Sequence, residues 1–333
     1  MKRFGNNDIQ LSILITNHNV DCRKLLIDLH GQMRRWGGKG EIIVLDDCSG
    51  ERELTHGNIE VAESLKCTTY LVNDRNRGAA VCRNMLADRA RGEWLIFIDS
   101  DAEVTHDTFV THYWKYRYVA DILVGGLFHP QTNPNPESTL RFKYERKADR
   151  QRIAWKRSIN PYSCFTAFNI MARKEVFKKV RFDETCKDYG YEDALFGVEL
   201  KKHGMSIWHI DNALKHTGLD TNESFIRKTD VSLKTLARLR MKGKMEGESR
   251  VGNMADKIER WGLSGMAHMI FKKTKGILLW NLKGHHPSLL LFSVYKLLKF
   301  ISIRKEMESI SQQNKNQDRN NNAPSKSIQG IGR

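Results

Sequence analysis

The sequence contains no uninterrupted apolar run of about 18 residues, the length that a helix needs to cross a bilayer. The nearest approach is residues 276–305, where a Lys-Gly-His-His-Pro segment breaks the run and Lys296 and Lys299 interrupt its second half. This pattern predicts helices that dock or lie on a surface. The first ten residues also lack the apolar core of a signal peptide, so we expect a cytoplasmic protein.

Cysteine and proline are both scarce. The six cysteines form no Cys-x-x-Cys unit and show no zinc-ligand spacing. We therefore expect reduced thiols that mostly fill the core of an intracellular protein. Four of the six prolines fall within residues 127–162, a long polar segment. A connection of this length in a compact domain is expected to be functional or to carry a helix of its own.

Acidic residues are outnumbered by basic ones, 39 against 55, which gives a formal charge of +16. Such a balance favours phosphate, nucleic acid or an anionic membrane as a partner. No recognisable nucleic-acid-binding module is present, and much of the excess charge lies near the C-terminus. We therefore expect no nucleic-acid partner, although a non-enzymatic nucleic-acid-binding protein stays as an alternative.

Strand and helix patterns alternate along the first part of the chain. Short apolar, β-branched runs that predict strands occupy residues 11–16, 41–47, 67–73 and 94–99. Apolar residues at helical spacing that predict helices occupy residues 22–36 and 78–92. This alternation predicts an α/β fold with a doubly wound, mostly parallel central sheet flanked by helices.

Composition divides the chain into three parts: residues 8–240, expected to form the α/β domain; residues 241–308, a basic, amphipathic helical extension; and residues 309–333, a polar tail expected to be disordered. In the extension, lysines alternate with leucine, isoleucine, phenylalanine and tryptophan. That mixture suits an anionic lipid surface, and we hypothesise loose attachment to the inner face of the cell membrane. Packing against the catalytic domain or a partner chain is the alternative.

Polar residues follow the predicted strands where these end. Thr16, Asp47 and Asp99 each lie at the carboxyl end of a strand, where α/β sheets bind ligands. Asp99 and Asp101, separated by Ser100, can hold a divalent cation such as manganese or magnesium that bridges to a diphosphate. The alternative is a solvated acidic turn.

Three later features are also candidates. Glu192 and Asp193 begin a predicted helix, where acids either complement the helix dipole or act as a general base toward an incoming hydroxyl. His216 follows a later strand and could complete a metal shell, although a lone histidine is more often structural. Residues 76–84 join a strand to a helix and could present backbone amides and either Arg77 or Arg83 to phosphate. A P-loop and a G-x-G-x-x-G sequence are both absent.

Taken in order, six segments resemble glycosyltransferase family 2, the inverting GT-A transferases, over about residues 10–240: LSILITNHN, EIIVLDDCSGE, NRGAAVCRN, GEWLIFIDSDAEV, GYEDALFGVEL and ALKHTGL. The resemblance implies a GT-A, Rossmann-like fold. It also implies metal-dependent, inverting transfer of a hexosyl or N-acetylhexosaminyl group from a nucleotide-diphosphate sugar, expected to be a UDP-sugar. The acceptor would be a hydroxyl of a saccharide or a lipid-linked glycan in surface polysaccharide synthesis.

The resemblance also assigns roles to residues. Asp193 would be the catalytic base, with Glu192 in support. Asp101 and His216 would bind manganese or magnesium, assisted by Asp99. The implied nucleotide-sugar site consists of Thr16, His18, Asp47, Asn76, Arg83, Asp99 and Ser100.

The chain departs from the family pattern in its first turns. Ile15 replaces a proline, His18 replaces a tyrosine and Cys48 replaces a glycine, and these changes bear on the choice of nucleotide base. A sugar nucleotidyltransferase is the alternative enzyme, because it would have a similar α/β sheet and a similar use of a divalent cation. It would require a glycine-rich, basic first turn, which the segment TNHNVDCRK lacks.

Overall fold

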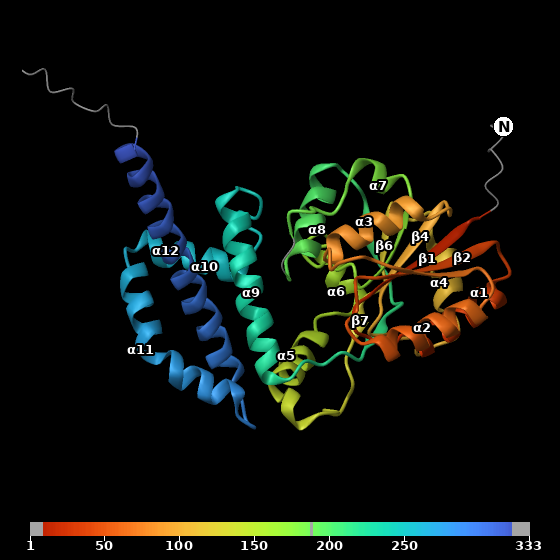
Figure 1. Ribbon diagram of the computed structural model, residues 1–333, viewed down its shortest axis with the longest axis horizontal. Helices are drawn as coiled ribbons and strands as arrows, with labels where there is room; N and C mark the ends of the chain where they lie inside the picture. The colour runs from red at the N-terminus through yellow and green to blue at the C-terminus, as the bar shows by residue number, and fades with distance from the viewer. Residues whose placement is uncertain (1–8, 187–188, 322–333) are drawn as a thin grey trace, which may run out of the picture.

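The computed structural model describes residues 9–186 and 189–321. Figure 1 shows an α/β part built on a twisted sheet and, beside it, a group of long helices from the C-terminal third of the chain. The central sheet has the order β3-β2-β1-β4-β8-β6-β9. Its first four strands are parallel: β1 (Leu11–Asn17), β2 (Gly40–Asp46), β3 (Thr68–Val72) and β4 (Trp94–Asp99).

The other half of the sheet contains a reversal. Strand β8 (Asn169–Arg173) runs antiparallel to β4 and to β6 (Ile122–Val124), whereas β9 (Ile207–His209) is parallel to β6. The predicted mostly parallel sheet is therefore confirmed, with β8 running against the other six strands. A small second sheet has the order β5-β10-β7: β5 (Ala102–Glu103), β10 (Leu214–His216) and β7 (Leu127–Phe128).

Helices cover both faces of the central sheet, as Figure 1 shows. One face packs on α1 (Arg23–Trp36), α2 (Arg52–Ser64) and α4 (Phe109–Tyr116). The other face packs on α3 (Ala79–Arg89), α7 (Val176–Lys179) and α8 (Glu192–Lys202). The sheet is therefore a middle layer with a separate apolar core on each side.

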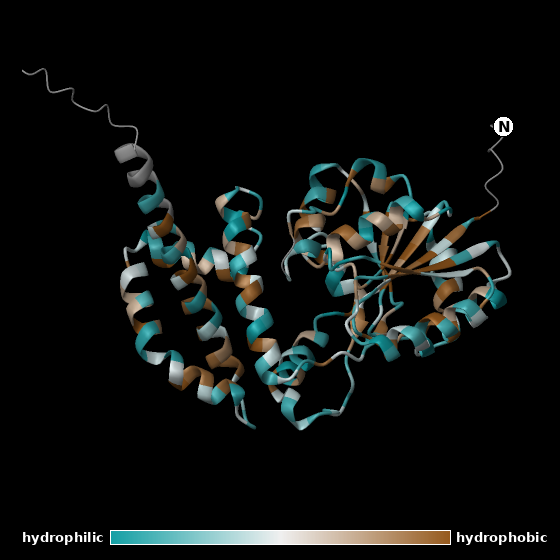
Figure 2. Cartoon of the chain, viewed as in Figure 1, coloured by the Kyte–Doolittle hydropathy of each residue, from teal (hydrophilic) through white to brown (hydrophobic). Residues whose placement is uncertain are grey.

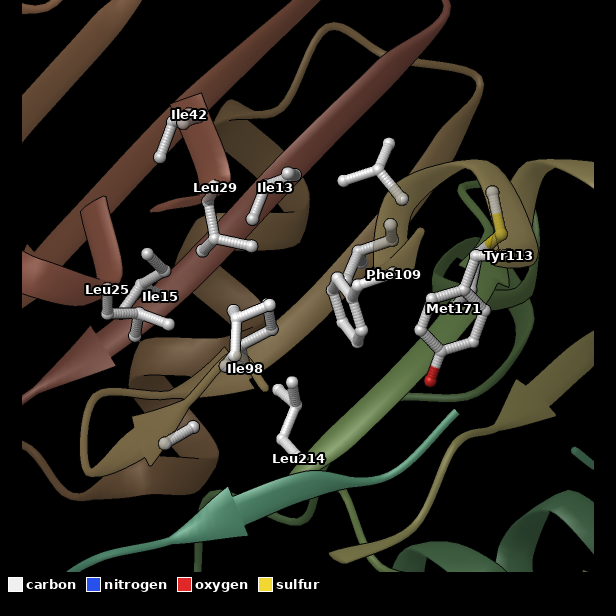
Figure 3. Close-up of a cluster of buried hydrophobic side chains, with 14 of the residues drawn as sticks. Ile13, Ile15, Leu25, Leu29, Ile42, Ile98, Phe109, Tyr113, Met171 and Leu214 are labelled. Atoms are coloured by element: carbon white, nitrogen blue, oxygen red, sulfur yellow. The ribbon is translucent and has the colours of Figure 1, made fainter. Parts of the chain in front are cut away.

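Strand β1 illustrates why the predicted strands are continuous apolar runs. Ile13 and Ile15 point into the first core, where Figure 3 shows them beside Leu29 and Leu25 of α1, whereas Leu14 points into the second. All three β1 side chains are fully buried. A strand that is covered on both faces requires apolar residues at every position, because successive side chains point to opposite faces.

The long polar segment at residues 127–162 carries helices of its own. It contains a 3₁₀ turn, η1 (Pro136–Ser138), followed by α5 (Thr139–Asp149) and α6 (Ala154–Ile159). Asn135 begins this stretch by accepting a hydrogen bond from the backbone amide of Glu137, with Pro136 at the first helical position. Helix α5 lies between the sheet domain and the C-terminal helices (Figure 1).

The C-terminal helices are α9 (Asn222–Met241), α10 (Arg250–Arg260), α11 (Ser264–Lys283) and α12 (Leu289–Asn321). The expected break at residues 283–287 is where α11 gives way to α12. Helix α9 shares an apolar core with α12, in which Leu233 and Leu236 meet Phe300 and Ile301. The boundary at residue 240 stays a prediction, and it falls at the end of this shared helix. Among the described helices, none is long and apolar enough to cross a membrane.

The structure differs from the prediction of a disordered tail beginning at residue 309. Helix α12 continues to Asn321, so residues 309–321 are helical. A helix that is already formed extends at little cost, and the three glutamines, Lys315 and Arg319 of this segment have good helix propensity. Residues 322–333, the rest of that tail, lie outside the described residues.

Candidate active site

The carboxyl ends of three neighbouring strands meet at one edge of the sheet. Thr16 of β1 stands opposite Asp99 of β4, and Asn17 of β1 stands opposite Asp46 of β2. The hydroxyl of Thr16 donates a hydrogen bond of 3.2 Å to Asp99 Oδ1. The strand order therefore brings the ends of β1, β2 and β4, where the sequence places Thr16, Asp47 and Asp99, to one rim.

A cavity of about 310 Å³ opens beside this rim. Five residues expected in the site line it: Arg83, Asp99, Glu192, Asp193 and His216. Its far wall comes from α5 and the segments around it, and includes Arg141, Glu145 and Arg152. The α8 acids and the β4 carboxylate thus share one cavity.

Arg83 connects the two acidic sides of the cavity. Its guanidinium lies 2.8 Å from Asp99 Oδ1 and 3.2 Å from Asp193 Oδ1, and its side chain is only 4% exposed. Burial alone would lower the pKa of Arg83, but the two carboxylates outweigh burial and raise it. Arg83 is therefore a permanent cation held between two acids. Its predicted role near the donor phosphates stays a prediction.

Asp193 is held by donors from two directions. Its Oδ2 accepts hydrogen bonds from the Thr166 hydroxyl at 3.1 Å and the Ala167 backbone amide at 2.9 Å, while Oδ1 faces Arg83. These contacts fix the orientation of the carboxylate. A carboxylate held in this way at the wall of a cavity could accept a proton from a hydroxyl group bound there.

Glu192 differs from its neighbour. Its Oε2 is buried and has no hydrogen-bond partner in the described part of the chain. Burial, reinforced by the charge of Asp193, raises the pKa of Glu192 to about 7. The two adjacent acids therefore sit in contrasting environments, one fully hydrogen-bonded and the other lacking a partner for one oxygen.

A left-handed turn starts α8 and directs these acids into the cavity. Gly190 has φ +98° and Tyr191 has φ +70°, a region that residues other than glycine rarely adopt. A Cβ atom on Gly190 would also come within 2.5 Å of the Ser232 side chain on α9. Helix α9 thus packs directly against the turn that positions Glu192 and Asp193.

Asp101 and His216 form the candidate cation site. Pairing of β5 with β10 places His216 Nε2 2.9 Å from Asp101 Oδ2. Gly218 makes room for this carboxylate, because a Cβ atom there would lie 2.4 Å from Asp101 Oδ2. The described residues contain no cluster of three or more acidic, histidine or cysteine ligands. A carboxylate and an imidazole nevertheless fit a Mg²⁺ or Mn²⁺ ion whose shell is completed by water and phosphate oxygens.

His129 is a residue of this site that the sequence analysis did not select. It follows β7, is 1% exposed, and places Nε2 3.1 Å from His216 Nδ1. Its Nδ1 lies 3.0 Å from Asp149 Oδ1 at the end of α5. Burial alone would raise the pKa of Asp149, but the contacts with His129 and Arg152 together outweigh burial and lower that pKa. The signal available in the sequence was that His129 lies within residues 127–162, the segment expected to be functional. Nothing in the local sequence, however, indicates that it pairs with His216.

Asp47 is engaged inside its own loop. Its buried carboxylate accepts hydrogen bonds from Asn73 Nδ2 at 2.9 Å and from the backbone amides of Arg77 and Gly78, each at 2.8 Å. The amides that the sequence suggested for phosphate are therefore already bonded to this carboxylate. Asp47 holds the turn between β3 and α3 in place.

The remaining predicted nucleotide contacts lie near this loop or at the β4 end. His18 is exposed, and its Nδ1 lies 3.0 Å from the Asp47 carbonyl oxygen. Asn76 is exposed, whereas Ser100 is buried and donates its backbone amide to the Thr16 carbonyl at 3.1 Å. Exposure of His18 and Asn76 leaves both available to a ligand.

Two curated proteins are similar to part of this chain. An uncharacterized glycosyltransferase of Haemophilus influenzae is 34% identical over 91 residues, which is 27% of this chain and 29% of that protein. The putative teichuronic acid biosynthesis glycosyltransferase TuaG of Bacillus subtilis is 40% identical over 63 residues, 18% of this chain and 24% of that protein. The chain thus matches less than a third of the length of either relative.

The fold and the family are shown by two broader matches. The mannosyltransferase PcManGT from Pyrobaculum calidifontis, solved with GDP-Man and Mn²⁺, superimposes with a TM-score of 0.52 at 12% identity, covering 89% of this chain and 86% of that one. This likeness supports the GT-A architecture of the sheet domain. Residues 12–181 match the model of Glycosyl transferase family 2, slightly more than half of the chain. The chain belongs to glycosyl transferase family 2, as its six ordered segments predicted.

Proposed function

We propose that the protein is a metal-dependent, inverting glycosyltransferase that moves a sugar from a nucleotide-diphosphate sugar to an acceptor hydroxyl. One observation carries this proposal. Asp99 at the end of β4 and Asp193 at the start of α8 pair with the same guanidinium, that of Arg83, inside a single cavity. In this proposal Asp99 lies on the side of the donor diphosphate, and Asp193 accepts a proton from the acceptor within the same cavity.

In this proposal the donor side of the cavity holds a cation together with a diphosphate. Asp101 and His216 would bind manganese or magnesium, and Asp99, oriented by Thr16, would assist. A bound cation would neutralise the charge that develops on the leaving diphosphate. Without it, the carboxylates would repel the donor.

His129 positions His216 for this role. If the Nε2 lone pair of His216 faces a cation, the ring hydrogen must sit on Nδ1, which points at His129 Nε2. His129 can accept that hydrogen bond because its own Nδ1 hydrogen is donated to Asp149. Partners of this kind behind a ligating histidine typically orient the ring and raise its basicity.

Asp193 acts on the acceptor side as the general base, with Glu192 in support. The acceptor oxygen forms a bond to the anomeric carbon while its proton passes to the Asp193 carboxylate. The bond from that carbon to the diphosphate oxygen breaks, and the leaving diphosphate takes the electron pair. A single displacement of this kind inverts the anomeric configuration.

The proposed donor is a UDP-sugar carrying a hexosyl or N-acetylhexosaminyl group. Its nucleotide would lie along the ends of β1, β2 and β4, against Thr16, His18, Asp47, Asn76, Arg83, Asp99 and Ser100. The similarity to TuaG, a putative glycosyltransferase of teichuronic acid biosynthesis, supports a role in surface polysaccharide synthesis. The acceptor would be a saccharide or a lipid-linked glycan, presented in the cytoplasm.

A donor screen tests this function. Purified protein is incubated with UDP-, GDP- and dTDP-sugars and a mixture of saccharide acceptors, and release of nucleoside diphosphate is measured with Mn²⁺ or with EDTA. We expect release from one donor class that requires the metal, and an inverted anomeric linkage by NMR. Equal release in EDTA, or a retained configuration, would contradict the mechanism. Pyrophosphate release from a nucleoside triphosphate and a sugar phosphate would favour the nucleotidyltransferase instead.

A further inference from the structure

Helix α11 is apolar on two opposite sides. On its inner side Ala267, Phe271, Leu278 and Leu282 are buried in the cores shared with α9 and α12. On its outer side lie large apolar residues that remain exposed, here called the α11 stripe: Met266 (50%), Met269 (53%), Ile270 (42%), Ile277 (69%) and Trp280 (80%). Their spacing of three, four and seven residues places them along one side of the helix, over about 21 Å at a rise of 1.5 Å per residue.

The charged side chains of α11 and the segments adjoining it in the chain are all basic. Residues 261–305 contain eight lysines and arginines and no aspartate or glutamate. Lys272, Lys273 and Lys275 lie on α11, are exposed, and form no ion pair with any residue in the described ranges. Lys283 and Lys299, in contrast, pair with Glu223 and Asp230 of α9. Three lysines without an ion pair among the described residues therefore lie on the helix that carries the exposed apolar residues.

The position of α11 leaves this surface open. Figure 1 shows α11 at the outer edge of the helical part, with α12 and α9 between it and the sheet domain. Figure 2 shows hydrophobic segments along α11 as well as along the packed helices. Trp261 (69% exposed) precedes α11, and Trp280 lies near its other end. Tryptophan is enriched where a protein meets the boundary between lipid and water.

We propose that the α11 stripe and its lysines bind the surface of an anionic lipid bilayer, with α11 lying in the plane of the headgroups. Apolar side chains would enter the acyl boundary while lysines remain at the level of the phosphates. The helix is not a span, consistent with the hydropathy of the described helices. The proposal concerns where the enzyme works and is independent of the donor chemistry.

A second copy of the chain fits this surface less well. A two-fold contact places the same patch on both sides of the interface. Lys272, Lys273 and Lys275 would then meet their own counterparts, and residues 261–305 offer no carboxylate to pair with them. Like charges brought together in this way oppose association. An anionic membrane supplies the complementary charge that a second copy lacks.

Vesicle sedimentation of the full-length protein tests the charge requirement. We expect binding to vesicles of phosphatidylcholine with phosphatidylglycerol, and little binding to phosphatidylcholine alone. The triple variant K272Q/K273Q/K275Q should bind the anionic vesicles roughly 100-fold more weakly, given about a fivefold contribution per surface lysine. The matched control K66Q/K178Q/K179Q removes three exposed lysines from the sheet domain and should bind within about twofold of wild type.

The apolar requirement is tested with I277S/W280S, which should reduce partitioning by about tenfold or more because two exposed anchors are lost. Trp155→Ser is the control, because Trp155 of α6 is 64% exposed on the sheet domain. The proposal would be overturned if the wild-type protein did not bind vesicles. It would also be overturned if each α11 variant lost no more vesicle binding than its sheet-domain control. A wild-type dimer that I277S/W280S converts to a monomer would overturn it as well, because a second copy would then cover the stripe. Donor turnover in solution should be the same for all these variants, which separates this test from that of the catalytic function.

Discussion

Replacing Asp193 with asparagine should stop sugar transfer and leave donor binding in place. Asparagine has nearly the same shape, and its carbonyl oxygen can still accept from the Thr166 hydroxyl or the Ala167 amide. It cannot accept a proton as a carboxylate does. General-base catalysis typically contributes about 10²–10⁴-fold in rate, so kcat should fall by that factor.

The structural cost of this change should be limited. Arg83 loses its 3.2 Å contact with a charged partner but keeps the shorter 2.8 Å ion pair with Asp99. Loss of one charged hydrogen bond in a partly buried site typically costs about 1–3 kcal/mol of stability. The proposed cation ligands are untouched, because His216 lies in the separate β5-β10-β7 sheet and Asp101 immediately precedes β5.

The assay combines three measurements on wild type and Asp193→Asn. Release of nucleoside diphosphate at saturating donor gives kcat, calorimetry with a nucleoside diphosphate and Mn²⁺ gives donor-site affinity, and thermal melting reports the structural cost. Thr166→Val is the matched control, because it removes one hydrogen bond to the same carboxylate while the base remains. We expect its kcat to fall far less than that of Asp193→Asn.

Two results would refute this reasoning. If Asp193→Asn retained kcat within tenfold of wild type, less than general-base loss typically costs, Asp193 would not be the base. If nucleotide affinity fell as steeply as kcat, the residue would act through the donor site. In the second case the ion pair with Arg83 would be its main role, and Glu192, which lines the same cavity, would become the candidate base.

Three further predictions follow from the same site. Asp101→Ala should weaken binding of a nucleoside diphosphate in the presence of Mn²⁺ and leave metal-free binding unchanged, and calorimetry showing equal losses in both conditions would contradict the metal role. His129→Phe should lower Mn²⁺ affinity by about 10–100-fold, because it removes the partner that orients His216; His209→Phe, a change at another buried histidine, should cost stability without affecting that affinity. Glu192 has a pKa of about 7 in the fold and 4.5 as its ordinary value, so its contribution to stability should decline as pH rises from about 4.5 to about 7. Melting of wild type and Glu192→Gln at pH 5 and pH 8 checks this, and an identical pH dependence of the two proteins would show that the carboxyl is not buried as described.

Local sequence patterns were sufficient for much of the fold. Strands β1 and β4 were predictable because both faces of each are covered, which requires continuous apolar residues. The break between α11 and α12 was predictable from Gly284 and Pro287, and the acids at the end of β4 from their position after an apolar run. Each of these features depends on residues that are close together in the chain.

The reversal of β8 and the helical course of α12 beyond residue 309 were not predictable in this way. A strand buried on both faces has the same apolar composition whichever direction it runs, so nothing in residues 169–173 distinguishes antiparallel from parallel pairing. The end of α12 is polar, and polarity alone suggested disorder. Its helical state follows from continuation of a helix that tertiary packing has already formed.

The sequence by itself determined which acids could do the chemistry, because motif and strand-end position are local. Only the tertiary structure decided how they are connected. Arg83, which also pairs with Asp99, meets Asp193 across a separation of 110 residues, and His129 meets His216 across 87. These contacts depend on strand order and on where α5 and α8 pack. The local sequence pattern of a segment does not reveal which distant segment its side chains will contact.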